Sequence, residues 1–335
     1  MKRRNFITGL GTAVAGLPLT GCSAYLRKND NTRYTPKGVI PRRKLGKTGI
    51  QVSMLGFGSH LKKELIAQPE LRDRMIKLGY EGGINTFDVY DHSGYEQFKP
   101  MGKSLRGFRK EVIISLCVVK EIDRIQEEID GALTDFYTDY IDLYRLYTVD
   151  DDRVNILEKN KKSGKIRAIG VVAHDEQKIM GYIDNYGDIL DYVMIVYNFH
   201  HNQGTVNKET YPPNDYTALI PRCERLGLGI LGIKPMGSDA MIELARKEKF
   251  FSDRKASIAQ AMLRHIYQTK EIHCAMPAMN NMEEVVTNLE SAYNSSLSPY
   301  EKGLLEKLSG IAALTKSAYL PYHYRWLENW AAKTV

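Results

Sequence analysis

Groups suited to acid–base chemistry are concentrated in one short stretch of the chain. Asp88, Tyr90, His92 and Tyr95 fall within eight residues, at the end of an apolar run. Carboxylate, phenol and imidazole groups transfer protons in general acid–base catalysis, and they also hydrogen-bond the hydroxyls of sugar-like ligands. The same composition is typical of a polar surface loop. The stretch therefore predicts a catalytic or ligand site, with a solvated loop as the alternative.

Further polar residues stand where later apolar runs end. They include Tyr147, His174, the pair Tyr197-Asn198, and Lys234. His174 suits a catalytic base or a ligand contact, and a hydrogen-bonded loop histidine fits equally well. We predict that His92, His174, Tyr197 and Asn198 line a ligand pocket.

Histidine and cysteine spacing gives no sign of a metal site or a disulfide framework. His200 and His201 are adjacent but lack a third ligand at a recognisable spacing. Four cysteines cannot hold together a chain of 335 residues. Cys117, Cys223 and Cys274 lie in apolar or helical stretches, so we expect them to be buried.

Short apolar runs alternate with amphipathic stretches from about residue 50 onward. Such runs are typical of buried strands, and the stretches between them are typical of helices. Five successive runs start 26 to 28 residues apart, which is the length of one strand–helix unit. The predicted strands are 52–58, 85–90, 112–118, 140–147, 166–173, 192–198, 228–235 and 272–278. The predicted helices are 71–82, 96–107, 122–137, 152–163, 176–184, 215–226, 256–268 and 282–291.

Eight strand–helix pairs favour a closed (β/α)8 TIM barrel of the α/β class over an open doubly wound sheet. No G-x-G-x-x-G follows the first strand, so the dinucleotide fingerprint of the open sheet is missing. A further helix near 298–310 and an aromatic tail to Trp330 are expected to pack outside the barrel. In such barrels the chemistry lies at the C-terminal ends of the strands, which is where the polar residues above are expected.

Several blocks, in order, resemble the aldo-keto reductase family. They are Leu45–Gly49, Val52–Gly58, Gly83–Asp88, Met101–Leu105, Tyr140–Tyr144, Gly164–Val171, Tyr197-Asn198 and Pro277–Asn288. The resemblance spans roughly residues 42–292. It implies a barrel opened by an N-terminal hairpin, and reduction of carbonyls with NADP or NAD as cofactor.

The resemblance also implies a catalytic tetrad of Asp, Tyr, Lys and His. Asp88 matches, whereas the Tyr position holds Ser93, between Tyr90 and Tyr95. The Lys position holds Cys117, with Lys120 three residues further on, and the His position holds Tyr147. We therefore predict a degenerate tetrad, and an altered catalytic set drawn from Asp88, Tyr90, Tyr95, Tyr147 and Lys120.

The cofactor positions implied by the resemblance are substituted as well. Val172-Ala173, Met194 and Ile233 stand where the family holds and stacks the nicotinamide. Ala278 and Glu284 stand where it uses Lys and Arg near the adenosine phosphate, and an acid there would repel a 2′-phosphate. The cofactor contacts expected to remain are Lys234, Gly237, Ser238, Asn280 and Asn288. Some relatives bind an iron–sulfur cluster through C-terminal cysteines; the tail here has none, so no cluster is expected.

The N-terminus has the layout of an export signal. Arg3-Arg4 precede an apolar stretch, which resembles a twin-arginine signal, and Leu19–Cys22 resembles a bacterial lipobox. Lipidation is thus expected at Cys22. The protein is predicted to be an exported lipoprotein, anchored to a membrane and facing the periplasm or the cell exterior.

Four segments follow from these patterns. We expect a signal peptide at 1–22, a tether at 23–41, the barrel at 42–292 and a C-terminal extension at 293–335. The net charge is +7, of which three charges lie in the first four residues. No dense basic stripe with interleaved aromatics follows, so a nucleic-acid partner is not expected. The expected partners are a small molecule and, through the anchor, a membrane.

Three hypotheses about function remain open. The resemblance favours an oxidoreductase with a shifted tetrad, in which Tyr90 or Tyr95 is the acid and Lys120 or Lys234 supplies charge. A non-redox enzyme would use Asp88, Asp91, His92 and His174. A non-catalytic ligand-binding lipoprotein would keep the fold alone.

Overall fold

Parallel strands and surrounding helices form the body of the protein. The computed structural model describes residues 35–58, 68–91, 97–118, 124–200, 214–237, 239–249 and 257–315. Within these residues, seven parallel strands run side by side in chain order. They are β3 (Thr86–Asp91), β4 (Ile113–Val118), β5 (Ile141–Leu146), β6 (Ile166–Ala173), β7 (Tyr192–Val196), β8 (Gly229–Ile233) and β9 (Cys274–Met276).

Residues 54–58 close the sheet into a barrel. Leu55 bridges Ala275 of β9 and Phe57 bridges Phe87 of β3, both in parallel register. The expected strand 52–58 is therefore divided, because its first residues pair with the hairpin and its later ones lie between β9 and β3. A Cβ at position 58 would meet the carbonyl oxygen of Pro277 at 2.5 Å, so glycine is required for this close approach. The predicted (β/α)8 TIM-barrel class is confirmed.

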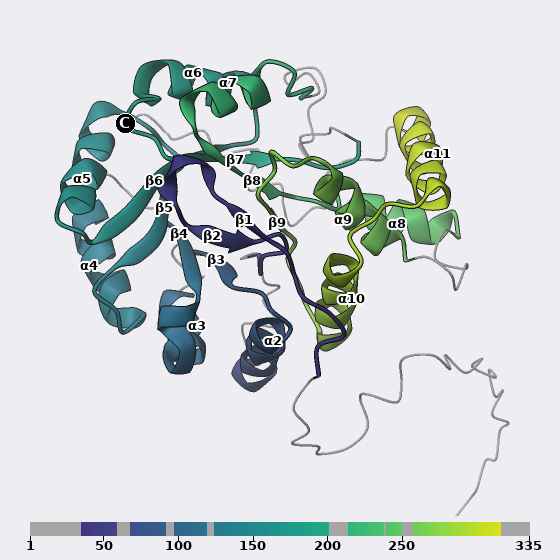
Figure 1. Ribbon diagram of the computed structural model, residues 1–335, viewed down its shortest axis with the longest axis horizontal. Coiled ribbons are helices and arrows are strands. Elements are labelled where there is room, and N and C mark those ends of the chain that lie inside the picture. Colours follow the sequence, from purple (N-terminus) through teal and green to yellow (C-terminus); the bar gives the residue numbers. More distant parts are fainter. Residues whose placement is uncertain are drawn as a thin grey trace, which may run out of the picture. The chain divides into compact units, whose positions relative to one another are not determined.

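Helices follow the strands and surround them (Figure 1). The barrel helices are α2 (Pro69–Glu81), α3 (Phe98–Leu105), α4 (Ile125–Asp135), α5 (Asp151–Lys162), α6 (Glu176–Tyr186), α7 (Leu219–Leu226), α9 (Ile258–Gln268) and α10 (Met282–Tyr293). A short helix, η3 (Arg106–Glu111), follows α3, and α8 (Asp239–Lys247) and α11 (Pro299–Thr315) are additional. The sequence predicted α11 as 298–310 but did not predict α8. No helix in the described part of the chain is both long and apolar enough to cross a bilayer.

An N-terminal hairpin covers the end of the barrel at which the strands begin. It consists of β1 (Arg42–Lys44), η2 (Gly46–Thr48) and β2 (Gln51–Ser53). The Lys47 amide donates to the Gly227 carbonyl at 2.7 Å, just before β8. The Arg43 guanidinium donates to the carbonyls of Tyr267 and Thr269, ahead of β9. The hairpin does not cover the opposite end of the barrel, where the strands end and where the functional site is expected.

Side chains along each strand point alternately into the barrel and out toward the helices, as expected for the two-residue repeat of a β-strand. They form two apolar layers. The outer layer packs against the helices and includes Ile114, Leu116 and Tyr144. The barrel interior is filled from the hairpin upward by Leu45, Ile50 and Val52. Above these lie Leu143, Ala168, Val172, Tyr192, Met194, Leu231, Cys274 and Met276. A third cluster joins α8, α9 and α11.

Candidate functional site

The barrel interior holds one buried ion pair near the expected site. Asp88 of β3 and Arg145 of β5 are 2% and 3% exposed. Arg145 Nη1 donates to Asp88 Oδ1 at 2.6 Å and Nη2 donates to Oδ2 at 3.1 Å. The Ser115 hydroxyl of β4 also donates to Oδ1 at 2.7 Å. Both carboxylate oxygens are thus occupied by donors from the two following strands.

Strand register explains why these three side chains meet. Asp88 lies opposite Ser115, and Cys117 lies opposite Arg145, along adjacent parallel strands. β3 continues to Asp91, so Asp88 lies within the strand, three residues before its end. The pair is consequently set below the mouth of the barrel, inside its wall.

Burial and neighbouring charges determine the protonation states of the residues around the ion pair. Burial lowers the pKa of Arg145, but the Asp88 carboxylate together with Cys117, Tyr192 and Tyr147 raises it by more, so the net pKa is raised. Arg145 therefore stays cationic. Burial raises the pKa of the Cys117 thiol to about 12, with Arg145 opposing the shift, so Cys117 stays neutral. Burial also raises the pKa of the Tyr192 phenol, which lies in the same interior.

Tyr147 follows β5 and reaches the mouth of the barrel. It stands two residues after Arg145, so both side chains belong to the inward-facing set. Tyr147 is half-buried and packs against the interior apolar cluster. The Tyr147 phenol is close enough to interact electrostatically with the Arg145 guanidinium. A half-buried phenol thus lies near a cation that is anchored by a carboxylate.

Two basic residues lie at the rim next to one another. Lys234 follows β8, and burial lowers its pKa to about 8. Burial, and then the charge of Lys234, lower the pKa of His174, which is therefore neutral at pH 7. Gly237 donates its amide to the Lys234 carbonyl at 2.9 Å and has a φ of 74°, a conformation that glycine adopts without strain. Asn198 is fully buried beneath Gly237.

Tyr197 does not join these residues at the mouth. It belongs to the outer apolar layer, where its ring lies 5.5 Å from that of Tyr216. Its hydroxyl shares a hydrogen bond of 2.8 Å with Thr269. Strand alternation turns Asn198 inward and Tyr197 outward, so only one member of the predicted pair faces the interior.

The start of α10 holds the residues expected near the adenosine of a cofactor. The side chain of Asn281 caps the helix by accepting the Glu284 amide at 2.8 Å. Glu284 Oε2 accepts the amide of Asn280 at 2.7 Å, and Oε1 accepts the side-chain amide of Asn281 at 2.9 Å. A carboxylate therefore already occupies the helix N-terminus where an anion would bind. Asn288 lies buried further along α10.

Several predicted residues fall outside the described residues. They are Cys22, His92, Tyr95, Lys120 and Ser238. Tyr90 is described by its backbone, which pairs in register with Cys117. Among the described residues, no three His, Cys, Asp or Glu side chains converge to hold a metal ion.

The sequence of this chain matches a known protein family. The model of the Aldo/keto reductase family matches residues 55–309. The chain belongs to the aldo/keto reductase family. L-galactose dehydrogenase from Arabidopsis thaliana is 23% identical over 302 residues, covering 75% of this chain and 90% of that protein. Aldo-keto reductase YhdN from Bacillus subtilis is 26% identical over 146 residues, covering 37% of this chain and 44% of that protein.

Solved aldo/keto reductase structures share the fold. Aldo-keto reductase AKR11C1 from Bacillus halodurans superposes with a TM-score of 0.61 at 20% identity, covering 85% of this chain and 99% of that one. An aldo-keto reductase from Klebsiella pneumoniae, solved in complex with NADPH, gives a TM-score of 0.61 at 21% identity. That match covers 82% of this chain and 96% of the Klebsiella chain.

The substituted aldo/keto reductase positions are brought together by the fold. Val172, Met194 and Ile233 belong to one apolar cluster of the barrel interior together with Tyr147. Where the family pairs Asp with Lys, this chain pairs Asp88 with Arg145 from the next strand but one. Sequence reasoning missed Arg145 and Ser115. The available signal was an arginine inside the apolar run Ile141–Leu146, on the same strand face as Leu143.

Proposed function

We propose that this family member is a nicotinamide-dependent carbonyl reductase that uses a different set of residues for proton transfer. The observation that carries the proposal is the two-pronged Asp88–Arg145 ion pair beneath Tyr147. In the family a cation beside the catalytic phenol promotes proton transfer, and here Arg145 supplies that cation. Tyr147 then takes the role of general acid, in place of Tyr90 or Tyr95.

The chemistry of each group follows from its charge. A nicotinamide cofactor, when bound, supplies a hydride to the carbonyl carbon. Tyr147 donates its phenolic proton to the carbonyl oxygen, which completes the alcohol. Arg145 stabilises the phenolate left on Tyr147, because a cation favours the ionised form of a neighbouring acid. Asp88 holds the guanidinium in position and does not itself lose or gain a proton.

The residues at the rim fit a dinucleotide that lacks a 2′-phosphate. Lys234 supplies a positive charge, and Gly237 offers a backbone amide group beside it. Glycine is needed there because φ is 74° and a Cβ would lie 2.9 Å from Met241. The Glu284 carboxylate occupies the N-terminus of α10 and would repel an added phosphate. We therefore propose NADH as the preferred cofactor.

One observation favours a second candidate function. Val172, Met194 and Ile233 offer apolar contacts where a carboxamide needs hydrogen bonds. A buried polar group without partners is costly, so the same surface suits a mainly apolar ligand. The alternative is a ligand-binding lipoprotein that performs no hydride transfer.

Calorimetric titration of the nucleotide-free protein with NADH and, separately, NADPH tests the proposal. We expect micromolar binding of NADH, with NADPH binding weaker by roughly tenfold because of Glu284. Glu284→Gln should narrow that difference while leaving NADH affinity nearly unchanged. NADH oxidation in the presence of a panel of aldehydes and ketones then measures turnover. Absence of heat with either nucleotide at millimolar concentration would refute the reductase and leave the apolar ligand-binding function.

A further inference from the structure

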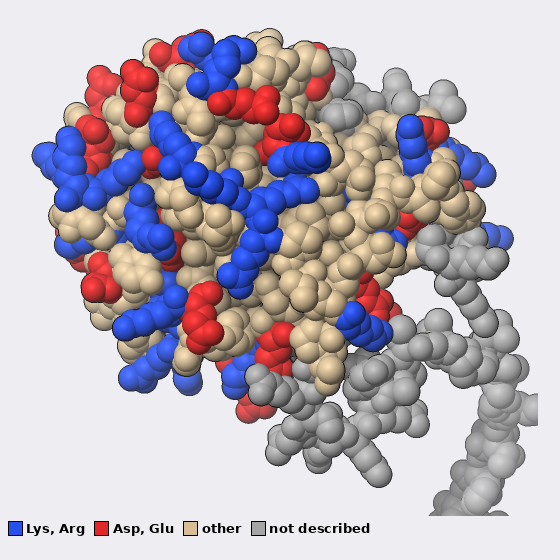
Figure 2. Space-filling model, viewed as in Figure 1, with Lys and Arg blue, Asp and Glu red and all other residues tan. Residues whose placement is uncertain are grey.

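The end of the barrel that carries the hairpin is markedly basic. It is formed by the hairpin, the final residues of the barrel helices, and the loops that lead into the strands. Figure 2 shows this face, with Lys and Arg gathered in a band across it. Among its described residues, exposed basic side chains outnumber exposed acidic ones. The basic ones include Arg42, Lys44, Lys47, Arg106, Lys110, Lys162, Arg167, Arg225 and Lys270, and the acidic ones include Glu111, Asp139, Asp184, Asp188 and Glu224.

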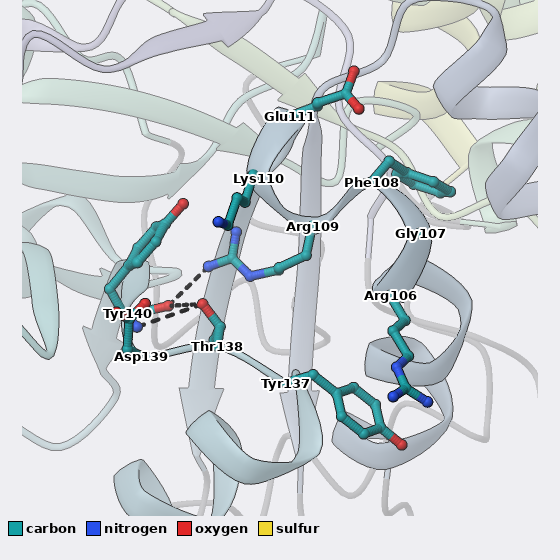
Figure 3. A pocket seen from close by; sticks show the side chains of 10 residues that line it. All are labelled: Arg106, Gly107, Phe108, Arg109, Lys110, Glu111, Tyr137, Thr138, Asp139 and Tyr140. Atoms are coloured by element: carbon teal, nitrogen blue, oxygen red, sulfur yellow. Dashed lines mark hydrogen bonds between the residues drawn. The ribbon is translucent and has the colours of Figure 1, made fainter.

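A cavity of about 640 Å³ opens on the same face, between η3 and the loop before β5. Arg106 and Lys110 line it from one side and Tyr137 and Tyr140 from the other (Figure 3). The Arg106 guanidinium lies 4.5 Å from the centre of the Tyr137 ring. Glu111 and Asp139 also line it, against the three cations Arg106, Arg109 and Lys110. The cavity thus combines a small net positive charge with phenol groups, which suits the phosphate and glycerol of a phospholipid headgroup.

Exposed apolar side chains accompany this charge. Val39 is 85% exposed and Tyr137 is 51% exposed; with Tyr300 they are the exposed large hydrophobic residues of the described chain. Val39 lies three residues before the hairpin and follows Gly38, which packs against Tyr293 at the C-terminal end of α10. Tyr137 follows α4 and takes a left-handed conformation, with a φ of 52°. Two of the three therefore project from the basic face.

The polypeptide also reaches the barrel on this face. Lys37 pairs with Glu290 near the end of α10 at 2.7 Å, and the hairpin follows directly. The expected lipidation site, Cys22, stands twelve residues before Tyr34. An extended chain spans at most about 3.6 Å per residue, so an anchor at Cys22 would keep the barrel within roughly 50 Å of the bilayer.

We propose that this basic face, centred on Lys44, Lys47, Lys110 and Tyr137, docks on a bilayer containing anionic phospholipids. The cations attract the negative lipid surface, and Val39 and Tyr137 insert at the headgroup level. The mouth of the barrel, with Tyr147 and Lys234, then points away from the membrane. Lipidation brings the protein to the surface, and the face orients it there.

Vesicle flotation tests the docking with the full chain carrying Cys22→Ser, so that no acyl chain contributes. The vesicles are phosphatidylcholine alone or phosphatidylcholine with phosphatidylglycerol. The test variant is Lys44→Gln, Lys47→Gln and Lys110→Gln together. The matched control is Lys99→Gln, Lys178→Gln and Lys302→Gln, which removes three exposed charges from other surfaces. Both triple variants have the same residues 1–41, including Cys22→Ser, so any vesicle binding by that segment is the same in the two proteins.

The expected result is selective loss. Each basic residue near an anionic surface contributes about fivefold in affinity, so the test variant should lose on the order of 100-fold on phosphatidylglycerol vesicles. The control should retain most of its binding, and added salt should abolish the difference. Equal losses in both triple variants would overturn the proposal, because net charge alone would then explain binding. Tighter binding to duplex DNA than to the vesicles would also overturn it.

A fluorescence experiment reports the orientation independently of charge. Tyr137→Trp should shift its emission to shorter wavelength when anionic vesicles are added, because the ring enters the headgroup region. Tyr300→Trp, at an equally exposed tyrosine on α11, should not shift. A shift at position 300 without one at 137 would contradict the proposed face.

Discussion

Asp88 and Arg145 are each other's main source of compensation inside the barrel. Removing two charges from water is costly, and the pair tolerates it through two parallel hydrogen bonds and the Ser115 hydroxyl. Loss of one member leaves the other charged and buried. The position is therefore more sensitive to a single substitution than to replacement of both residues.

Arg145→Met should reduce the free energy of unfolding by about 3–5 kcal/mol, because it leaves the Asp88 carboxylate uncompensated. The double variant Asp88→Leu with Arg145→Met should regain much of that loss. Urea denaturation of the three proteins measures both effects. A loss below about 1 kcal/mol for Arg145→Met would show that the pair is not the buried one described.

Lys234 should make nucleotide binding depend on pH. Its pKa is lowered to about 8, so the ammonium is mostly charged at pH 7 and mostly neutral at pH 9. Affinity for NADH should therefore fall by roughly tenfold between these values, since the cation proposed to bind the phosphates is lost. Calorimetry across this range checks the sign. Lys234→Met should bind more weakly at pH 7 and lose the pH dependence; an unchanged profile in this variant would contradict the assignment.

At the scale of elements, alternation along each strand decides which residues meet. Gly170 of β6 and Tyr192 of β7 lie opposite one another and both face the interior. A Cβ at position 170 would collide with the Tyr192 ring. This contact lets a large aromatic residue fill the barrel beside the Asp88–Arg145 pair.

Gly170→Ala should destabilise the protein by about 1–3 kcal/mol, because the interior is overpacked there. Gly181→Ala on α6 is the matched control, since nothing lies within 4 Å of its added Cβ. That substitution should stabilise by about 0.5–1 kcal/mol through lower unfolded-state entropy. Thermal unfolding gives the melting temperature of each variant. If both melting temperatures shifted in the same direction, the close contact between position 170 and the Tyr192 ring would be contradicted.

Strands and helices were largely predictable from the sequence, because apolar runs and their spacing repeat with each unit. The ends agree to within a few residues: β3 is Thr86–Asp91, where 85–90 is predicted. The cross-strand contacts between Asp88, Ser115 and Arg145 depend on register. Register is set when the whole barrel closes, and no local pattern encodes it. Tyr197 faces the outer layer and not the predicted pocket, because the alternation of side chains along β7 continues past the end of the strand.

At the scale of the whole molecule, the two ends of the barrel have different roles. The hairpin closes one end and presents basic and apolar side chains, whereas Tyr147, His174 and Lys234 lie at the other. The family is shown by a match over residues 55–309, while the anchor at Cys22 rests on the sequence pattern alone.

Cys22→Ala should release the expressed protein from the membrane fraction at high salt, because the acyl chains would be lost and the basic face alone is screened. Fractionation of cells followed by immunodetection measures the release. The full-length chain with Cys223→Ala is the control, since Cys223 is buried and should have no effect on localisation. Retention of Cys22→Ala in the membrane at high salt would contradict the lipobox assignment.

The most direct test of the account is the turnover number for NADH-dependent carbonyl reduction by Tyr147→Phe. Tyr182→Phe serves as the control, because Tyr182 is a neighbouring tyrosine whose hydroxyl donates to the Tyr147 carbonyl at 3.4 Å. We predict that Tyr147→Phe lowers kcat by about 10²–10⁴-fold with unchanged NADH affinity and melting temperature, while Tyr182→Phe stays near the wild-type rate. A Tyr147→Phe protein that turns over as fast as wild type would show that the proton comes from another residue.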